Sequence, residues 1–437
     1  MKGTVKITGG IPLKGTATPI PNKNSILAAL PSSLLTNKTI EYRNVPKTSD
    51  VAKMLEILEK LGAEVSCDDY KKICVTCKNI KTHKIDRKIG GSIRASALFV
   101  GPLLARLGKA EIPLPGGCVL GQRSLAAHTD AFKQVGVKIT FRKNSVLFEA
   151  PKNTPSNSKI WMIEASVTAT ENLCMYLAGV SSKFTIQGCA CEPHVSELLK
   201  LLKNMGAKIS GIGSSKLEIE GKKHLGGGKY IPGPDQVDIA GYMVAAAVTK
   251  GQIRIKNANI FEITKGLTTW FSKFNLSIVE DGKDLVVDGS GDLFIDTVNS
   301  GFPMASGDLP KLYPRPWPGF PADVLPVMVT LACKTKGRMQ IQNWMYENGL
   351  DFTRELNGLG AQIFTCDPQR VIVTGPIEFK GGEVISPSVI QACKALFLAA
   401  LADKVETTLH GVDILKRRYP DIFEVYKKLG ANIEILE

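Results

Sequence analysis

The most regular pattern of hydrophobic and polar positions in the chain is a short phrase that occurs six times. Each copy holds the end of an amphipathic helix, one glycine or asparagine, and a segment in which apolar and polar residues alternate. A glycine or asparagine at this point is typical of a left-handed helix C-cap, and the alternation after it predicts a strand. The copies recur every 69 to 85 residues, as LEKLGAEV at 58–65, FKQVGVKI at 132–139, LKNMGAKI at 202–209, FSKFNLSI at 271–278, LNGLGAQI at 356–363 and YKKLGANI at 426–433.

The repetition predicts six α/β units, because ordinary alternation of helices and strands would not repeat one phrase at similar spacing. At 437 residues the chain is too long for one simple core, so we expect two domains of three units each. Two segments rich in proline or glycine are candidate crossings between them, ATPIPNKNS at 17–25 and GGGKYIPGPDQ at 226–236.

Composition places the chain among soluble globular proteins, with 44% apolar and 22% charged residues. No run of about 18 apolar residues occurs, and the N-terminus lacks the apolar stretch of a signal peptide, so we expect a cytoplasmic protein without a membrane partner. Ten scattered cysteines indicate reduced thiols. CVTC at 74–77 has the spacing of half a zinc site, but no second pair lies at a suitable distance, and we expect no metal.

Charge narrows the class of ligand. Lys and Arg outnumber Asp and Glu by 55 to 41, a formal net charge of +14. These basic residues are spread along the whole chain, without an arginine-rich tail or interleaved aromatic residues, and this distribution does not favour nucleic acid. An anionic small substrate explains the excess as well.

Five short stretches combine turn residues with charged or nucleophilic side chains. They are PNKNS with Lys23 and Asn24, GGSIRAS with Arg94, PGGCVLGQRSLAAH with Cys118, Arg123 and His128, PGFPAD with Asp323, and KRRYPDIF with Arg417 and Arg418. Each has an ordinary alternative, since Lys23 could be a solvated loop residue, Asp323 a helix N-cap and Cys118 a small apolar residue in the core. Together they supply several cations, a carboxylate and a loop thiol, a set that suits chemistry on a phosphorylated anion.

Over nearly its full length the chain resembles the enolpyruvyl transferases. The matching motifs are Lys23-Asn24, IRAS, PGGC followed by Gly-x-Arg, SVTATEN at 166–172, PDQVDIAGYMVAAAVTKG at 234–251, PGFPAD and LGANIE. The resemblance implies an α/β fold, a two-domain inside-out α/β barrel of six βαβαββ repeats with three in each domain. It also implies the domain bounds: residues 1–20 plus 233–437, completed by the N-terminal strand, and residues 21–232, which carry the Cys118 loop.

The resemblance further implies a reaction. Enolpyruvate would pass from phosphoenolpyruvate to the 3-hydroxyl of UDP-N-acetylglucosamine by addition and elimination, with release of phosphate, in peptidoglycan precursor synthesis. Phosphoenolpyruvate is then a co-substrate, no cofactor is implied, and no protein partner is indicated. Two alternatives stay open: another acceptor, such as UMP or shikimate 3-phosphate, or a non-catalytic relative that binds a sugar nucleotide.

Site residues follow from the resemblance position by position. Lys23 and Arg417 would act on phosphoenolpyruvate, Asp323 would accept the proton of the acceptor's hydroxyl, and Cys118 would act in protonation of C3 or in product release. The implied substrate-binding residues are Asn24, Arg94, Arg123, Ser124, Leu125, His128, Ser166, Val167, Thr168 and Asp323. For His128 a local structural role is an alternative.

The chain departs from the family's pattern at three positions. Gly349 in YENGLDF and Ile390 in SPSVIQACK stand where the family carries arginines that help to bind phosphoenolpyruvate. Glu164 stands where the family often has a lysine near the diphosphate. The basic residues that could replace the missing arginines are Lys394, Arg354 and Arg418, and the sequence leaves open whether any of them does.

Overall fold

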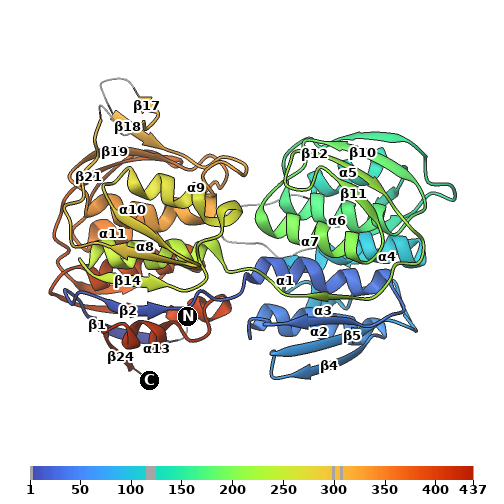
Figure 1. Cartoon of the computed structure of the whole chain (residues 1–437), viewed down its shortest axis with the longest axis horizontal. Coiled ribbons are helices and arrows are strands. Elements are labelled where there is room, and N and C mark those ends of the chain that lie inside the picture. Colours follow the sequence, from blue (N-terminus) through green and yellow to red (C-terminus); the bar gives the residue numbers. More distant parts are fainter. Residues whose placement is uncertain (1–2, 115–124, 298–300, 306–308, 437) are drawn as a thin grey trace. The chain divides into compact units, whose positions relative to one another are not determined.

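All six helix–cap–strand phrases form in the computed structural model, which describes residues 3–114, 125–297, 301–305 and 309–436. The residue between helix and strand has a φ between 61° and 115° in every copy, the region that glycine and asparagine tolerate best. Asn275 replaces glycine in the fourth copy and adopts this conformation too. The chain is a mixed α/β protein (Figure 1).

The described chain divides into two units. The terminal unit holds residues 3–20 and residues from 234 onward, and the central unit holds residues 21–114 and 125–233. The bounds of the two units fall at the Pro- and Gly-containing segments around residues 20 and 233.

Three sheets form the terminal unit. Their strand orders are β22-β23-β1-β24, β15-β16-β14-β2 and β17-β18-β19-β21-β20. The strands are β1 (Thr4–Thr8), β2 (Lys14–Ala17), β14 (Gln252–Ile255), β15 (Ser277–Asp281), β16 (Asp284–Asp288), β17 (Met304–Ala305), β18 (Leu309–Leu312), β19 (Gly337–Gln342), β20 (Gln362–Asp367), β21 (Arg370–Gly375), β22 (Gly382–Ile385), β23 (Glu406–His410) and β24 (Asn432–Leu436). In each sheet a three-stranded antiparallel group is joined by one parallel strand, which is β22, β2 or β18.

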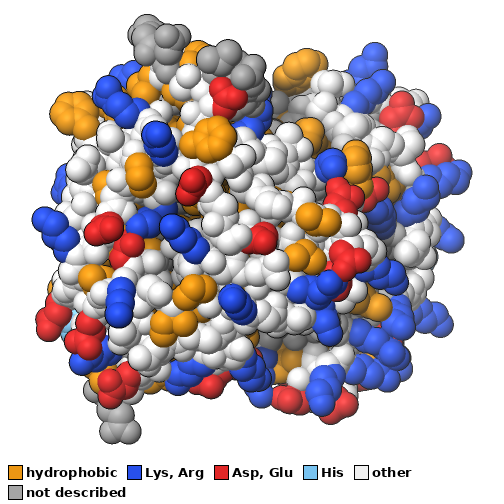
Figure 2. All heavy atoms as spheres, turned by 60° about the vertical axis from the view of Figure 1, so that its left-hand side comes forward, with side chains coloured by type: hydrophobic (Ala, Val, Ile, Leu, Met, Phe, Trp, Pro, Cys, Tyr) orange, Lys and Arg blue, Asp and Glu red, His pale blue; other side chains and the backbone are white. Residues whose placement is uncertain are grey.

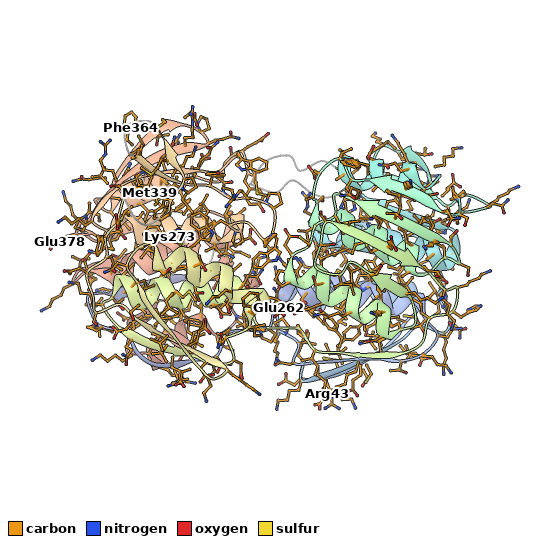
Figure 3. All side chains as sticks on the ribbon, turned by 45° about the horizontal axis from the view of Figure 1, so that its top comes forward. Arg43, Glu262, Lys273, Met339, Phe364 and Glu378 are labelled. Atoms are coloured by element: carbon orange, nitrogen blue, oxygen red, sulfur yellow. The ribbon has the colours of Figure 1, made fainter. Side chains whose placement is uncertain are left out.

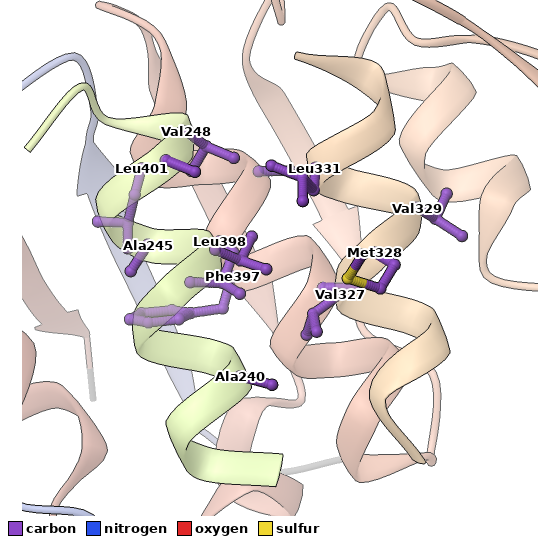
Figure 4. Packing of buried hydrophobic residues seen from close by; sticks show 14 of the residues in the cluster. Ala240, Ala245, Val248, Val327, Met328, Val329, Leu331, Phe397, Leu398 and Leu401 are labelled. Atoms are coloured by element: carbon purple, nitrogen blue, oxygen red, sulfur yellow. The ribbon is translucent and has the colours of Figure 1, made fainter. Parts of the chain in front are cut away.

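The interior of the terminal unit is made of three helices, α8 (Gln236–Val248), α10 (Leu325–Cys333) and α12 (Ile390–Ala402). Every residue of α8 and α10 is buried, and on α12 only Ile390 is partly exposed. A helix that is apolar around its whole circumference must be packed against other elements on every side to be shielded from water. Val248, Leu331 and Leu398 belong to the cluster of buried side chains that these helices share (Figure 4). The remaining helices are α9 (Phe261–Ser272), η3 (Ala322–Val324), α11 (Thr353–Gly358), η4 (Val412–Arg417) and α13 (Ile422–Lys428).

The central unit repeats the same sheet pattern. Its sheets have the orders β13-β3-β5-β4, β11-β12-β10-β9 and β6-β8-β7. The strands are β3 (Ile40–Arg43), β4 (Glu64–Asp68), β5 (Lys72–Thr76), β6 (Lys109–Pro113), β7 (Lys138–Phe141), β8 (Ser145–Glu149), β9 (Ser158–Trp161), β10 (Lys183–Gln187), β11 (Lys208–Ser210), β12 (Lys216–Glu220) and β13 (Gly228–Tyr230). In the first sheet β13 pairs parallel with β3, and in the second β9 pairs parallel with β10. In the third sheet a single parallel bridge joins Lys84 to Glu111 of β6.

Helices of the central unit carry five of the ten predicted substrate-binding residues, namely Asn24, Arg94, His128, Val167 and Thr168. The helices are α1 (Lys23–Ala29), η1 (Leu30–Leu35), α2 (Ser49–Leu61), α3 (Arg87–Gly90), η2 (Arg94–Phe99), α4 (Val100–Leu107), α5 (Ala126–Gln134), α6 (Val167–Ala178) and α7 (Pro193–Asn204). Helix α6 contacts α4, α5, α7 and η2, and ten of its twelve residues are buried.

In several strands exposed and buried side chains alternate, as along β12. Met339 of β19 is fully buried, whereas Phe364 of β20 is 69% exposed (Figure 3). On the face seen in Figure 2, Lys and Arg side chains are interspersed with Asp and Glu side chains. Among the described residues, no helix is long and apolar enough to cross a membrane.

Candidate functional site

Lys23 is the first residue of α1 and takes part in a buried ion pair. The helix starts here because the side-chain oxygen of Asn22 accepts the backbone N–H groups of Asn24 and Ser25, at 3.0 and 3.3 Å. Lys23 Nζ lies 2.7 Å from Oδ2 of Asp50 on α2, and both side chains are buried. The pair holds the amine in one place at the start of the helix.

A second group of predicted residues meets on neighbouring helices of the central unit. Arg94 begins η2, His128 lies in α5, and Thr168 is the second residue of α6. Nε2 of His128 lies 3.0 Å from Oγ1 of Thr168. Burial, and after it the charge of Arg94, lowers the pKa of His128 to about 4, so the ring is neutral at neutral pH. Helix α1 contacts both η2 and α6, so the segments that carry Lys23, Arg94 and Thr168 are neighbours.

Other predicted residues of this unit stand at helix starts. Leu125 directly precedes α5, and Ser166 and Val167 open α6. The side chain of Ser166 makes no capping hydrogen bond, so no serine oxygen occupies the first N–H groups of α6. The predicted residues Cys118, Arg123 and Ser124 lie outside the described residues.

In the terminal unit, the guanidinium of Arg418 lies between two carboxylates, buried Asp235 and partly exposed Asp323. Arg418 donates from Nε and Nη2 to the two oxygens of Asp235, at 2.8 Å each, and its Nη1 lies 3.6 Å from Oδ2 of Asp323. Burial raises the pKa of Asp235, but the Arg418 guanidinium outweighs this and holds that pKa below its usual range. Asp323 is partly exposed in η3, and Arg417 is exposed at the end of η4.

Lys394 is fully buried in the interior of the terminal unit. Its Nζ lies 2.8 Å from Oδ1 of Asp238 on α8 and 3.9 Å from the ring centroid of Tyr419. Room for the amine depends on Gly241, because a Cβ there would lie 2.3 Å from Lys394 Nζ. Burial lowers the pKa of Lys394, while the charge of Asp238 opposes that change.

A pocket of about 360 Å³ opens beside Asp323, within the terminal unit. It lies where β19 and β22 end and where α10, α11 and α12 begin. Its charged lining residues are Asp323, Asp351 and Glu355, and no basic residue of the described chain lines it. Gly349 also lines it, and a Cβ at that position would lie 2.1 Å from Nδ2 of Asn343. Asn343 therefore occupies the space that a side chain at position 349 would need.

None of the three basic residues considered as replacements for the missing arginines lines this pocket. Lys394 and Arg418 are buried and paired with Asp238 and Asp235, and Arg354 is exposed on α11. Ile390 begins α12 beside the pocket. The described chain thus carries no basic side chain at the two vacated positions or in the pocket next to them.

Sequence reasoning missed the acidic partners of these cations. Asp50, Asp235 and Asp238 were not singled out, although the last two lie in the quoted motif PDQVDIAG. Two carboxylates at the start of an otherwise apolar run are the signal that could have found them, because a buried carboxylate needs a cation or several hydrogen-bond donors.

Comparison with known proteins agrees with this architecture. Residues 7–426 match the EPSP synthase (3-phosphoshikimate 1-carboxyvinyltransferase) family. A UDP-N-acetylglucosamine 1-carboxyvinyltransferase of Treponema denticola is 36% identical over 431 residues, 99% of each chain. One of Bradyrhizobium diazoefficiens is 33% identical over 98% of this chain and 97% of its own.

Solved structures are similar in fold. The enolpyruvyl transferase NikO of Streptomyces tendae has a TM-score of 0.86 at 21% identity, covering 99% of this chain and 98% of its own. EPSP synthase of Acinetobacter baumannii has a TM-score of 0.76 at 16% identity, covering 100% of both chains. The family match over most of the chain and the full-length relatives lead to one conclusion: the chain belongs to the EPSP synthase family of enolpyruvyl transferases.

Proposed function

We propose that the chain transfers the enolpyruvyl group of phosphoenolpyruvate to the 3-hydroxyl of UDP-N-acetylglucosamine and releases phosphate, a step of peptidoglycan precursor synthesis. The observation that carries the proposal is the similarity of the whole chain to relatives of that name, at 33% and 36% identity. Family membership supports the type of reaction, and the relatives' names supply the acceptor.

In the proposed reaction the hydroxyl oxygen bonds to C2 of phosphoenolpyruvate while C3 takes up a proton. The tetrahedral ketal then expels phosphate, and loss of a proton from C3 restores the double bond. Asp323 would accept the hydroxyl proton. This role is supported by its partial exposure and by its carboxylate oxygens, which accept no hydrogen bond from the described residues. Cys118 would act in protonation of C3 or in product release.

Cations would compensate the phosphate and carboxylate charges of phosphoenolpyruvate. We assign this role to Lys23, Arg94, Arg123 and Arg417. The buried partner Asp50 supports it for Lys23, because the 2.7 Å ion pair orients the amine before substrate binds. The acceptor would contact Asn24, Ser124, Leu125, His128, Ser166, Val167, Thr168 and Asp323.

The positions of the missing arginines predict weaker binding of phosphoenolpyruvate than in relatives that carry them. A hydrogen bond to a charged group contributes about 1.5–3 kcal/mol. Gly349 and Ile390 supply none, and the pocket beside Asp323 is lined by carboxylates rather than by cations. A raised KM for phosphoenolpyruvate is therefore expected, with the acceptor's own binding unaffected.

We further propose the finer architecture of the family for this chain. Each unit would be an inside-out α/β barrel of three βαβαββ repeats, with domains at residues 1–20 plus 233–437 and 21–232. The shared strand pattern of the six sheets and the buried helices α8, α10 and α12 support it. The enzyme would act in the cytoplasm with no metal or cofactor beyond its co-substrate.

Phosphate release from phosphoenolpyruvate, measured with a panel of acceptors, tests the proposal. UDP-N-acetylglucosamine should support release, whereas UMP and shikimate 3-phosphate should not. The Asp323→Asn variant is the control for release that does not depend on the proposed base. Release with UMP or shikimate 3-phosphate alone would keep the chemistry and reject the acceptor. No release with any acceptor would reject the enzyme and favour a sugar-nucleotide-binding relative.

A further inference from the structure

A buried set of hydrogen bonds in the central unit begins at the amide of Asn172 on α6. Its Oδ1 accepts the backbone N–H of Gly101 at 2.6 Å, and its Nδ2 donates to the backbone carbonyl of Ala97 at 2.8 Å. A backbone N–H can only donate and a backbone carbonyl can only accept. These two contacts therefore fix which end of the amide is oxygen and which is nitrogen.

The fixed amide determines the tautomer of His128. The second hydrogen of Asn172 Nδ2 faces Nδ1 of His128 at 3.2 Å. Because an amide NH2 offers no lone pair, Nδ1 must be the unprotonated nitrogen of the neutral ring. The proton then lies on Nε2, 3.0 Å from Oγ1 of Thr168, and Nε2–H donates to that oxygen.

We infer that His128 is a positioning residue that makes the hydroxyl of Thr168 a hydrogen-bond donor to the substrate. Since Oγ1 already accepts the imidazole N–H, the hydroxyl hydrogen must point elsewhere. Within the part of the chain that the structure describes, no acceptor receives it. Thr168 is partly exposed in the first turn of α6, beside backbone N–H groups that the side chain of Ser166 does not cap.

The chemistry of this position selects an oxygen acceptor. A hydroxyl donor, uncapped helix N–H groups and the nearby charge of Arg94 all favour a negatively charged oxygen over a donor or an apolar group. This part of the inference rests on the proposed function, in which the ligand is the nucleotide-bearing acceptor and its phosphoryl oxygens receive the hydrogen bond. Thr168 then determines affinity for the acceptor and not for phosphoenolpyruvate.

The tautomer is tested first, on the ligand-free full chain. Nitrogen-15 NMR of the imidazole of His128 should show a neutral ring protonated on Nε2 at neutral pH. A ring protonated on Nδ1, or on both nitrogens, would overturn the inference. This measurement needs no substrate, so its result is independent of the proposed function.

Substitutions at Thr168 test the donor. Thr168→Val keeps the shape and removes the hydroxyl, so KM for UDP-N-acetylglucosamine should rise about tenfold or more, the size expected for one hydrogen bond to a charged oxygen. KM for phosphoenolpyruvate and kcat should stay within about twofold of the wild type. Thr168→Ser should retain the wild-type KM. An unchanged KM in Thr168→Val would overturn the inference, whereas a wild type without activity on this acceptor would reject the proposed function instead.

A matched control comes from the same helix. Thr170 is buried two residues further along α6, where its hydroxyl oxygen accepts the N–H of Ala190 at 3.0 Å. Thr170→Val should lower the melting temperature and leave KM for the sugar nucleotide unchanged. If it raised that KM as much as Thr168→Val does, the effect would come from the packing of α6, and the donor role of Thr168 would be rejected.

Discussion

Replacing Lys394 by methionine tests whether the interior of the terminal unit depends on a buried charge. Methionine has nearly the same length but carries no amine. In the native chain, Nζ lies 2.8 Å from Oδ1 of Asp238 and 3.9 Å from the ring centroid of Tyr419, with the lysine side chain 0% exposed. The other oxygen of Asp238 accepts the backbone N–H of Ile20 at 3.1 Å. The substitution leaves the Asp238 carboxylate buried without its cation.

The expected loss follows from the cost of a buried charge without a partner. Breaking such a pair by removing one member costs about 3–5 kcal/mol of unfolding free energy, more than the pair contributes relative to an apolar replacement. The double variant Lys394→Met with Asp238→Asn removes both charges and keeps an oxygen for Ile20. It should lose only about 1–3 kcal/mol, mainly from one imperfectly bonded amide. Restoring stability by a second substitution is the signature of the pair.

Urea unfolding measured by tryptophan fluorescence provides the assay. Of the four tryptophans only Trp161 lies in the central unit, so a Trp161→Phe background reports on the terminal unit alone. The folded state lowers the pKa of Lys394 from its ordinary value of 10.5, so the unfolded state binds more protons just below that pH. Stability should therefore rise with pH in that window, and Lys394→Met should lose this rise. The reasoning is refuted if the unfolding free energy of Lys394→Met lies within about 1 kcal/mol of its parent. It is also refuted if the losses caused by Lys394→Met and Asp238→Asn alone simply add up in the double variant.

Four further outcomes are expected. Asp323→Asn should lower kcat for phosphate release about 10²-fold to 10⁴-fold, as loss of a general base does, while its amide oxygen keeps a hydrogen-bond acceptor for the sugar nucleotide. Lys23→Met should raise KM for phosphoenolpyruvate tenfold or more, about the loss of one charged hydrogen bond, and a normal KM would reject its role. Because the pKa of His128 is about 4 in the folded chain and 6.5 unfolded, stability should fall by about 3 kcal/mol as pH falls from 6.5 to 4. His128→Gln should flatten that slope in thermal melts. Cys118 should be alkylated by the epoxide fosfomycin, and an unmodified Cys118 peptide in mass spectrometry would contradict its proposed placement.

The local parts of the fold could be predicted from the sequence because they depend on residues close in the chain. An amphipathic helix, a cap residue with positive φ and an alternating strand form one contiguous signal. Asn275 shows this most clearly, since the chemistry of asparagine predicts the conformation that glycine has in the other copies, and its φ is 61°. The pairing of β1 with β23 and β24, across about 400 residues, leaves no such signal in the chain.

The environment of the charged residues could not be predicted, because it depends on partners far away in sequence. In the sequence, Lys394 and Arg418 are cations that could bind an anion in place of the missing arginines. Their partners Asp238 and Asp235 lie 156 and 183 residues away. Only the folded chain shows that each cation is neutralised, and a lysine in an apolar helix gives no local indication of its carboxylate.

The distribution of charge between the two units, together with the buried ion pairs, bears on where an anionic substrate can bind. Residues 21–233 contain 31 Lys and Arg against 17 Asp and Glu, whereas the rest of the chain contains 24 of each, so the whole excess of +14 belongs to the central unit. In the terminal unit, Lys394 is paired with Asp238, and Arg418 is paired with Asp235 and lies 3.6 Å from Asp323. The charged residues that line the pocket beside Asp323 are all acidic. Residues 1–20 and 234–437 thus carry no net positive charge that would attract an anionic substrate. We therefore expect the anionic groups of the proposed substrates to bind mainly to basic residues of the central unit.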